Sequence, residues 1–253
     1  MIEHGHAVGY VEPDGLLVAT ALVFPFEDRV AWISMVVVTP AHRRRGLATR
    51  LLRHCLAYCE QAGLTPVLDA TEAGRRVYAA LGFTDRYAIS RWARAPSIPA
   101  VAPVSSEAAT PLRPLTPADL DSLVAWDRVR FGVSRAPVLR YCRQAAPHLA
   151  RVAETAGGTP AGYLLARPGR RATQLGPLVA DDDAIARLLI HDALAKTAGP
   201  VYIDVPETQA AFTRVLAEAG LTRQRGFIRM VKGPSAPLPP PASTYAIAGP
   251  DLG

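Results

Sequence analysis

Three arginines stand directly before a predicted helix and form the turn with the clearest chemical potential in the chain. The run Arg43-Arg44-Arg45 is followed by Gly46-Leu47-Ala48, and Pro40 separates it from an apolar strand. A helix N-terminus presents backbone N–H groups without partners and a partial positive charge, so it binds phosphate groups. Small residues at 46 and 48 let a pyrophosphate approach the backbone, and guanidinium groups add charge-assisted hydrogen bonds. The turn therefore predicts an anion site; the alternative is a solvated, arginine-rich helix cap.

The next predicted helix carries a tyrosine. Thr71 is its expected N-cap, Val77, Tyr78 and Leu81 form its buried stripe, and Gly82 ends it. The segment 71–83 reads Thr-Glu-Ala-Gly-Arg-Arg-Val-Tyr-Ala-Ala-Leu-Gly-Phe. Without a catalytic role, Tyr78 would be a packed aromatic on this stripe.

Hydrophobic periodicity predicts a β-meander in the first half, followed by alternating helices and strands. The predicted elements are strands at 6–11, 16–24 and 30–38, a helix from Leu47 to Gly63, a strand at 66–70, the helix just described and a strand at 83–92. The segment 95–111 is rich in Ala, Pro and Ser and has no periodicity, which predicts a linker.

The second half repeats this order after a leading strand and helix pair. We predict strands at 112–115, 149–155, 161–167, 172–179, 201–205 and 227–231, and helices starting at Thr116, near 138–144, at 183–196 and at 207–219. From the meander onward, both halves run three strands, helix, strand, helix, strand. We therefore predict a first domain at 1–95 that lacks its leading strand and helices, a linker at 96–111 and a second domain at 112–233. A proline-rich tail at 234–253 follows, and its apolar segment Tyr245-Ala246-Ile247-Ala248 is expected to dock on the protein.

Both sequence signatures resemble those of one enzyme family. The pattern Arg-x-x-Gly-x-Ala after a buried strand resembles the cofactor loop of the GNAT superfamily of N-acetyltransferases, and segment 71–83 resembles its second signature, a helix with a tyrosine one turn before Gly-Phe. The likeness is close over 7–92 and rests on topology over 112–231. It implies an α/β fold of tandem GNAT-like domains, each a mixed, mostly antiparallel sheet flanked by helices, with the second domain degenerate.

The resemblance also implies roles for the two signatures. Acetyl-CoA would be the acyl donor and an amine the acceptor, which attacks the thioester directly without a covalent enzyme intermediate. Val36, Val37 and Val38 would pair their backbone with the pantetheine arm as an added strand. The pyrophosphate would lie against Arg43, Arg44, Arg45, Gly46, Leu47, Ala48 and Thr49. Tyr78 would protonate the leaving CoA thiolate as general acid.

Other titratable residues are interpreted as structural or solvated. Asp69 is a candidate base, but Asp204 occupies the matching place in the second half, so we favour a structural role for both. His42 is expected to be exposed rather than catalytic. The second half has Asp181-Asp182-Asp183 in place of the arginine turn and Leu216 in place of Tyr78, which predicts that it is catalytically silent. It would close the acceptor cleft or form a homodimer.

Composition narrows the class of protein. The 253 residues are 49% hydrophobic and 20% charged, as in an ordinary globular protein, and the net charge of +6 comes almost entirely from arginine. Neither half interleaves basic and aromatic residues or shows a helix-turn-helix pattern, so we do not expect nucleic-acid binding.

No apolar run is long enough to span a membrane and no signal-peptide pattern begins the chain, which predicts a cytoplasmic protein. The cysteines, Cys55, Cys59 and Cys142, lack metal-ligand spacing, so no metal is expected.

The sequence thus predicts an N-acyltransferase. The alternative is a CoA-binding regulatory or scaffold protein that has the same fold without turnover. The acceptor is expected to be a small-molecule or peptide amine. Its identity is not predicted, because acceptor pockets are shaped by loops that carry no recognisable motif.

Overall fold

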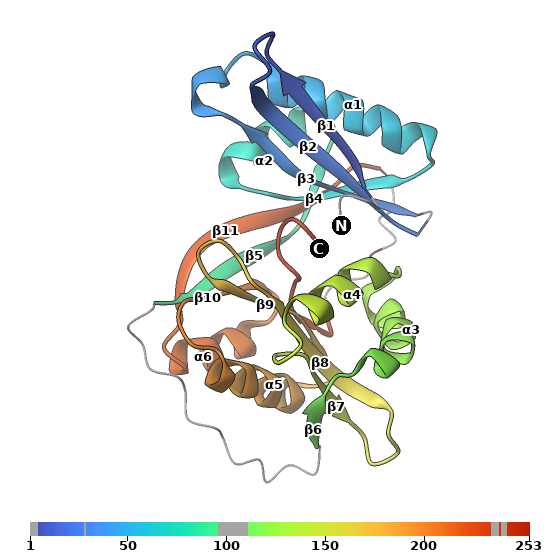
Figure 1. Cartoon of the computed structure of the whole chain (residues 1–253), viewed down its shortest axis with the longest axis vertical. Coiled ribbons are helices and arrows are strands. Elements are labelled where there is room, and N and C mark those ends of the chain that lie inside the picture. The colour runs from blue at the N-terminus through green and yellow to red at the C-terminus, as the bar shows by residue number, and fades with distance from the viewer. Residues whose placement is uncertain (1–4, 28, 96–110, 234–237, 239–241) are drawn as a thin grey trace. The chain divides into compact units, whose positions relative to one another are not determined.

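The computed structural model describes residues 5–27, 29–95, 111–233, 238 and 242–253 (Figure 1). The chain divides into two compact units, made of Met1–Arg86, Ile228–Pro237 and Pro250–Gly253, and of Tyr87–Phe227 and Leu238–Gly249. The predicted linker falls almost wholly on 96–110, outside the described residues. Most of the proline-rich run at 234–241 lies outside them as well.

The first unit is a mixed sheet in the order β1-β2-β3-β4-β11. Its strands are β1 (His6–Val11), β2 (Leu17–Phe26), β3 (Val30–Val38), β4 (Thr65–Ala70) and the last residues of β11 (Thr222–Val231). Strands β3 and β4 are parallel, and the other neighbours are antiparallel. Helix α1 (Leu47–Gln61) packs on one face because Leu51, Leu52, Cys55 and Cys59 recur at helical spacing and are buried. A shorter helix, α2 (Glu72–Ala80), follows β4.

The second unit has a sheet in the order β5-β10-β9-β8-β7-β6. These strands are β5 (Thr84–Arg94), β10 (Val201–Pro206), β9 (Thr173–Ala180), β8 (Pro160–Arg167), β7 (Arg151–Glu154) and β6 (Leu112–Pro114). Helices α3 (Leu120–Phe131) and α4 (Ala136–Ala145) cover one face, and α5 (Asp183–Lys196) and α6 (Ala210–Glu218) cover the other (Figure 1). Neighbouring residues of β8 show the two layers: a Cβ on Gly162 would meet Ile185 of α5 at 2.6 Å, and the Tyr163 hydroxyl donates to Asp127 of α3 at 2.6 Å.

Each unit is completed by a strand from the other half of the sequence. Residues Ile228–Val231 of β11 pair with β4, and β5 pairs with β10. The units therefore differ from the predicted domains 1–95 and 112–233, because two terminal strands are exchanged. Ladder hydrogen bonds are made by backbone groups that all residues except proline carry in full, so the sequence repeat does not reveal which strand each one joins.

The element order and the predicted fold class are confirmed. Helix α2 begins at Thr71, whose hydroxyl accepts from the Gly74 N–H at 3.2 Å. Thr116 and Asp119 form a capping box before α3, as their spacing suggests. In the described part of the first unit no α-helix precedes α1, whereas α3 and α4 precede the meander of the second unit.

The apolar end of the tail docks on the second unit. Strand β12 (Thr244–Ala246) pairs antiparallel with β9, and Tyr245, Ala246, Ile247 and Ala248 are buried. The sequence predicted docking without predicting its place.

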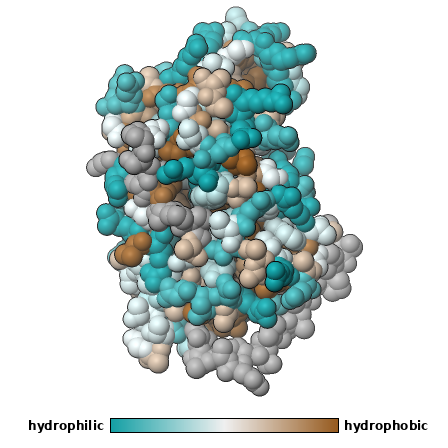
Figure 2. Space-filling view, turned by 180° about the vertical axis from the view of Figure 1, so that it is seen from behind, coloured by the Kyte–Doolittle hydropathy of each residue, from teal (hydrophilic) through white to brown (hydrophobic). Residues whose placement is uncertain are grey.

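The surface shown in Figure 2 is mainly hydrophilic, with apolar side chains in small separate patches. Among the described residues, no helix is both long enough and apolar enough to cross a membrane.

Candidate cofactor site

The predicted anion turn lies on the surface of the first unit. Gly46 is the N-cap of α1 and adopts a left-handed conformation with φ 75°, which favours glycine. No described side chain caps this helix end. Arg44 is also left-handed, with φ 63°, and Arg43, Arg44, Arg45 and Gly46 are all exposed. The first turn of α1 therefore begins at an exposed glycine with no described side-chain cap, which is the feature that the predicted anion site requires.

A pocket of about 300 Å³ lies beside this turn, where β3 and β4 part. The parallel ladder joins Val30–Trp32 to Thr65–Val67 and ends there. Val37 and Val38 pair with β2, but no described strand pairs with Val36–Val38 on the side toward β4. Met35, with φ 53°, lies where the β2–β3 register shifts. The end of β3 thus has a free backbone edge.

Half of the predicted cofactor residues line this pocket, namely Val36, Val37, Val38, Arg43 and Ala48. Leu47 instead packs in the core beneath α1, with 6% of its surface exposed. Arg44, Arg45, Gly46 and Thr49 lie outside the lining, although all four flank it along the chain. Five lining residues were not predicted as site residues: Leu52, Thr71, Ala73, Gly74 and Val77. Helical spacing finds two of them, because Leu52 is four residues after Ala48 and Gly74 is four residues before Tyr78.

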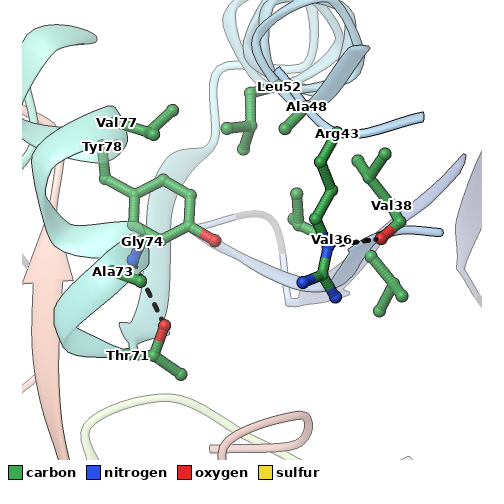
Figure 3. Close-up of a pocket in the computed structure, with 11 residues that line it drawn as sticks. Val36, Val38, Arg43, Ala48, Leu52, Thr71, Ala73, Gly74, Val77 and Tyr78 are labelled. Atoms are coloured by element: carbon green, nitrogen blue, oxygen red, sulfur yellow. Dashed lines mark hydrogen bonds between the residues drawn. The ribbon is translucent and has the colours of Figure 1, made fainter. Parts of the chain in front are cut away.

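Arg43 and Tyr78 face each other across the pocket (Figure 3). The Arg43 Nε donates to the Val38 carbonyl oxygen at 3.2 Å, which holds the guanidinium group beside the free edge of β3. Its other N–H groups make no hydrogen bond within the described chain, so they are available to an anion.

The Tyr78 side chain is half-buried and its ring meets Phe83 edge-on, with centroids 6.0 Å apart. Its hydroxyl points into the pocket and makes no hydrogen bond with another described residue (Figure 3). Burial raises the pKa of this hydroxyl above its ordinary value, so it stays protonated at neutral pH. Gly74 leaves room for the ring, because a Cβ there would lie 2.8 Å from Tyr78 Cε2.

Two polar contacts of His42, which the sequence did not predict, hold the residues just before the anion turn. The Thr39 hydroxyl lies 2.9 Å from His42 Nδ1, and His42 Nε2 lies 3.5 Å from the Glu12 carboxylate in the β1–β2 turn. His42 was expected to be exposed, but only 17% of its side chain is. These contacts tie the residues before Arg43 to a neighbouring hairpin, and therefore limit the positions that Arg43 can adopt.

The structural interpretation of Asp69 and Asp204 is confirmed. Asp69 accepts two hydrogen bonds from Arg229, at 2.8 and 2.9 Å, and its side chain is fully buried. Asp204 accepts two from Arg91, both at 2.7 Å, and is buried as completely. In each pair the two residues are directly opposite in the sheet: Arg229 of β11 faces Asp69 of β4, and Arg91 of β5 faces Asp204 of β10. A carboxylate held in this way is not free to act as a base.

In the second unit, the place that corresponds to this pocket is occupied by a segment of the same chain. Strands β9 and β10 pair over three residues and then part, and there β12 pairs with Leu178 and Val179 of β9. The Ile247 N–H donates to the Asp204 carbonyl oxygen of β10 at 2.9 Å. Asp182 caps α5 by accepting from the Ile185 N–H at 2.8 Å, and Tyr245 donates to Asp183 at 2.7 Å.

Comparison with known proteins agrees with both signatures and with the repeat. Residues 2–83 match the sequence model of the acetyltransferase (GNAT) family, and residues 123–246 match that of an acetyltransferase (GNAT) domain. The chain belongs to the GNAT family. Its two matched segments confirm a tandem GNAT arrangement.

Several GNAT proteins resemble the chain over nearly its whole length. It is 24% identical over 220 residues to YitH of Bacillus subtilis, described as an uncharacterised N-acetyltransferase, covering 87% of this chain and 76% of that one. Solved structures share the fold. A candidate acetyltransferase from Pyrococcus horikoshii aligns with a TM-score of 0.76 at 23% identity, over 95% of this chain and 78% of the other. A tandem GNAT protein from the clavulanic acid biosynthesis pathway aligns with a TM-score of 0.61 at 18% identity, over 92% and 85%.

Proposed function

We propose that the protein transfers an acetyl group from acetyl-CoA to an amine, using the pocket of the first unit. One observation carries this proposal: an uncapped helix N-terminus, the free edge of β3 and the unpartnered Tyr78 hydroxyl surround a single pocket. A diphosphate, an extended amide-bearing arm and a thiolate that needs a proton are chemically matched to these three features. Acetyl-CoA contains the diphosphate and the amide-bearing arm, and its thioester releases the thiolate when the acetyl group is transferred.

The residues on the page fit this donor. The α1 N-terminus and Arg43 would hold the pyrophosphate, and the backbone of Val36–Val38 would pair with the pantetheine amides. The amine nitrogen attacks the thioester carbonyl carbon, the carbon–sulfur bond breaks, and the sulfur leaves with the bonding electrons. Tyr78 gives this thiolate a proton, and solvent restores the tyrosine. The proton lost by the amine passes to a base that we leave unassigned, since Asp69 is held by Arg229.

Cofactor binding is tested by placing a charge in the pocket. Ala48→Asp introduces a carboxylate beside the predicted phosphate site, whereas Ala57→Asp places the same group on the exposed side of α1. We expect calorimetry to show at least a tenfold weaker acetyl-CoA affinity for Ala48→Asp and little change for the control. Equal affinities for the two variants would refute the proposed site.

The general acid is tested by CoA release against a panel of primary amines. We expect Tyr78→Phe to lower the rate roughly 100-fold while acetyl-CoA affinity is retained, as for loss of a general acid. Tyr58→Phe is the control, because Tyr58 lies on α1 outside the pocket. Binding of acetyl-CoA without release of CoA from any amine in the panel would favour the alternative, a CoA-binding regulatory protein.

A further inference from the structure

A larger cavity, of about 480 Å³, lies wholly within the second unit. It is formed by β6, α3, β7 and the turn between β7 and β8, which lie close together in Figure 1. Leu123, Trp126 and Val152 give it an apolar wall. It shares no residue with the pocket of the first unit.

An arginine lies in this cavity, but its hydrogen-bonding capacity is exhausted. Arg113 donates from Nε and Nη2 to Glu154 at 2.9 and 2.5 Å, and from both terminal nitrogens to Asp119 at 2.8 Å. Its remaining N–H donates to the Pro114 carbonyl oxygen at 3.1 Å. A guanidinium group has five N–H donors, and all five are used. The cavity therefore offers no free donor of this kind to an anionic ligand.

Glu154, in contrast, keeps unused acceptor capacity. Each of its oxygens accepts one hydrogen bond, both from Arg113, whereas a carboxylate can accept about four. Asp119 is more fully engaged, because its Oδ2 also accepts from the Thr116 N–H and hydroxyl, both at 2.7 Å. Two carboxylates and one guanidinium leave the lining with one net negative charge. The Glu154 side chain is 19% exposed, so a ligand in the cavity reaches it.

We propose that this cavity binds a small organic cation, in which a primary ammonium group contacts Glu154 and an aromatic or aliphatic body lies against the apolar wall. The ammonium supplies the hydrogen-bond donors that the free oxygen lone pairs of Glu154 accept, and it neutralises the excess negative charge. The apolar body of the ligand removes its own surface from water by lying against Leu123, Trp126 and Val152, which are themselves buried. This site does not depend on acyl transfer by the first unit.

The proposal is tested with three ligands of one shape, 2-phenylethylamine, 2-phenylethanol and phenylacetate, titrated into the whole protein by calorimetry. We expect the amine to bind at least tenfold more tightly than the neutral alcohol, and the anion to bind most weakly. Equal affinity for amine and alcohol, tighter binding of the anion, or no binding of the amine at millimolar concentration would overturn the proposal.

Two variants locate the binding. Glu154→Gln keeps the shape of the side chain and is expected to weaken amine binding at least tenfold. Asp121→Asn removes a charge from the exposed side of α3 and is expected to change it less than twofold. Ala125→Phe fills the cavity from an exposed helix position without touching the ion network, so it decides the question even if Glu154→Gln folds poorly. Unchanged amine binding by Ala125→Phe would place the amine elsewhere, for example in the acyl-transfer site, and would refute this one.

Discussion

In each unit two parallel strands separate after a short ladder, β3 from β4 in the first unit and β9 from β10 in the second. The two openings are built alike, but different residues occupy them. In both units a parallel pair of strands is joined over three residues and then parts before a helix. In the first unit a pocket remains, beside a helix end that no described side chain caps. In the second, β12 fills the gap, Asp182 caps α5, and a buried Leu216 stands at the place predicted to match Tyr78. A few residues at the loop and the tail therefore distinguish an open pocket from a filled opening on the same scaffold.

The opening that β12 fills also indicates what kind of ligand would suit the pocket of the first unit. Strand β12 is an extended chain that hydrogen-bonds to β9 and β10 in the second unit. An extended, amide-bearing arm would use the backbone edge of β3 in the same way. The pairing of β12 in the second unit therefore supports the proposed place of the pantetheine arm along β3.

The largest expected effect tests whether both units depend equally on their buried aspartate–arginine pairs for stability. Asp69→Ala and Asp204→Ala should each lower the free energy of unfolding by about 3–5 kcal/mol, because each leaves a buried guanidinium group without its carboxylate. Urea denaturation measures this. Asp121→Ala, which removes an exposed ion pair, is the control and should cost less than about 1 kcal/mol. A cost near the control for either buried aspartate would show that the two units are not held in the same way.

A smaller effect should separate stability from catalysis in the open unit. Gly74→Ala should gain up to about 1 kcal/mol of helix propensity in α2, since alanine favours a helix over glycine, and should lose part of this gain by moving the Tyr78 ring. Its methyl group would displace the Tyr78 ring, so we expect roughly a tenfold loss of the CoA-release rate with acetyl-CoA affinity largely kept. Thermal melts and steady-state rates measure the two quantities. Ala80→Gly, on the same helix but outside the pocket, should do the reverse: lower stability and an unchanged rate.

The closed unit should respond to loss of the contact between its tail and α5. Tyr245→Phe removes the hydroxyl that donates to Asp183 and should cost about 1–2 kcal/mol of stability. Burial, reinforced by this hydrogen bond, also raises the pKa of Tyr245. Tyr141→Phe, at an exposed position of α4, should be neutral. If both variants melt at the same temperature as the parent, the tail is not anchored by this contact.

The smallest effect for a single residue is a loss of stability in alkaline solution, caused by the two buried thiols of α1. Burial raises the pKa of Cys55 from 9.0 to about 11 and that of Cys59 to about 12 in the first unit. Well below pH 9 these thiols are protonated whether the chain is folded or not, so they add no pH dependence there. Above pH 9 only the unfolded chain ionises them, so stability should fall as pH rises, by about 1 kcal/mol per thiol at pH 10.

Urea denaturation between pH 8 and pH 10.5 measures this loss. Cys59→Ala should make it shallower, whatever the variant costs in packing at pH 8. A steep loss already complete by pH 9, or one that Cys59→Ala leaves unchanged, would assign the alkaline sensitivity to other groups.

The sequence by itself determined the features that arise from neighbours along the chain. Apolar residues at helical spacing set α1 and α5, Thr71 sets the start of α2, and Gly46 sets the left-handed bend before α1. Each depends on side-chain and backbone preferences within a turn or two, so reading the residues in order finds it. The two signatures were found for the same reason, since each is continuous in sequence.

Only the tertiary structure decided which distant segments meet. It exchanged β5 and β11 between the units, set Arg229 against Asp69 and Arg91 against Asp204, and placed β12 in the opening of the second unit. It also tied His42 to Glu12 and gathered Arg113 and Glu154 at one cavity. These contacts depend on backbone hydrogen bonds and charges that many segments could satisfy equally well. The choice among them is made by packing of the whole chain, which local sequence does not encode.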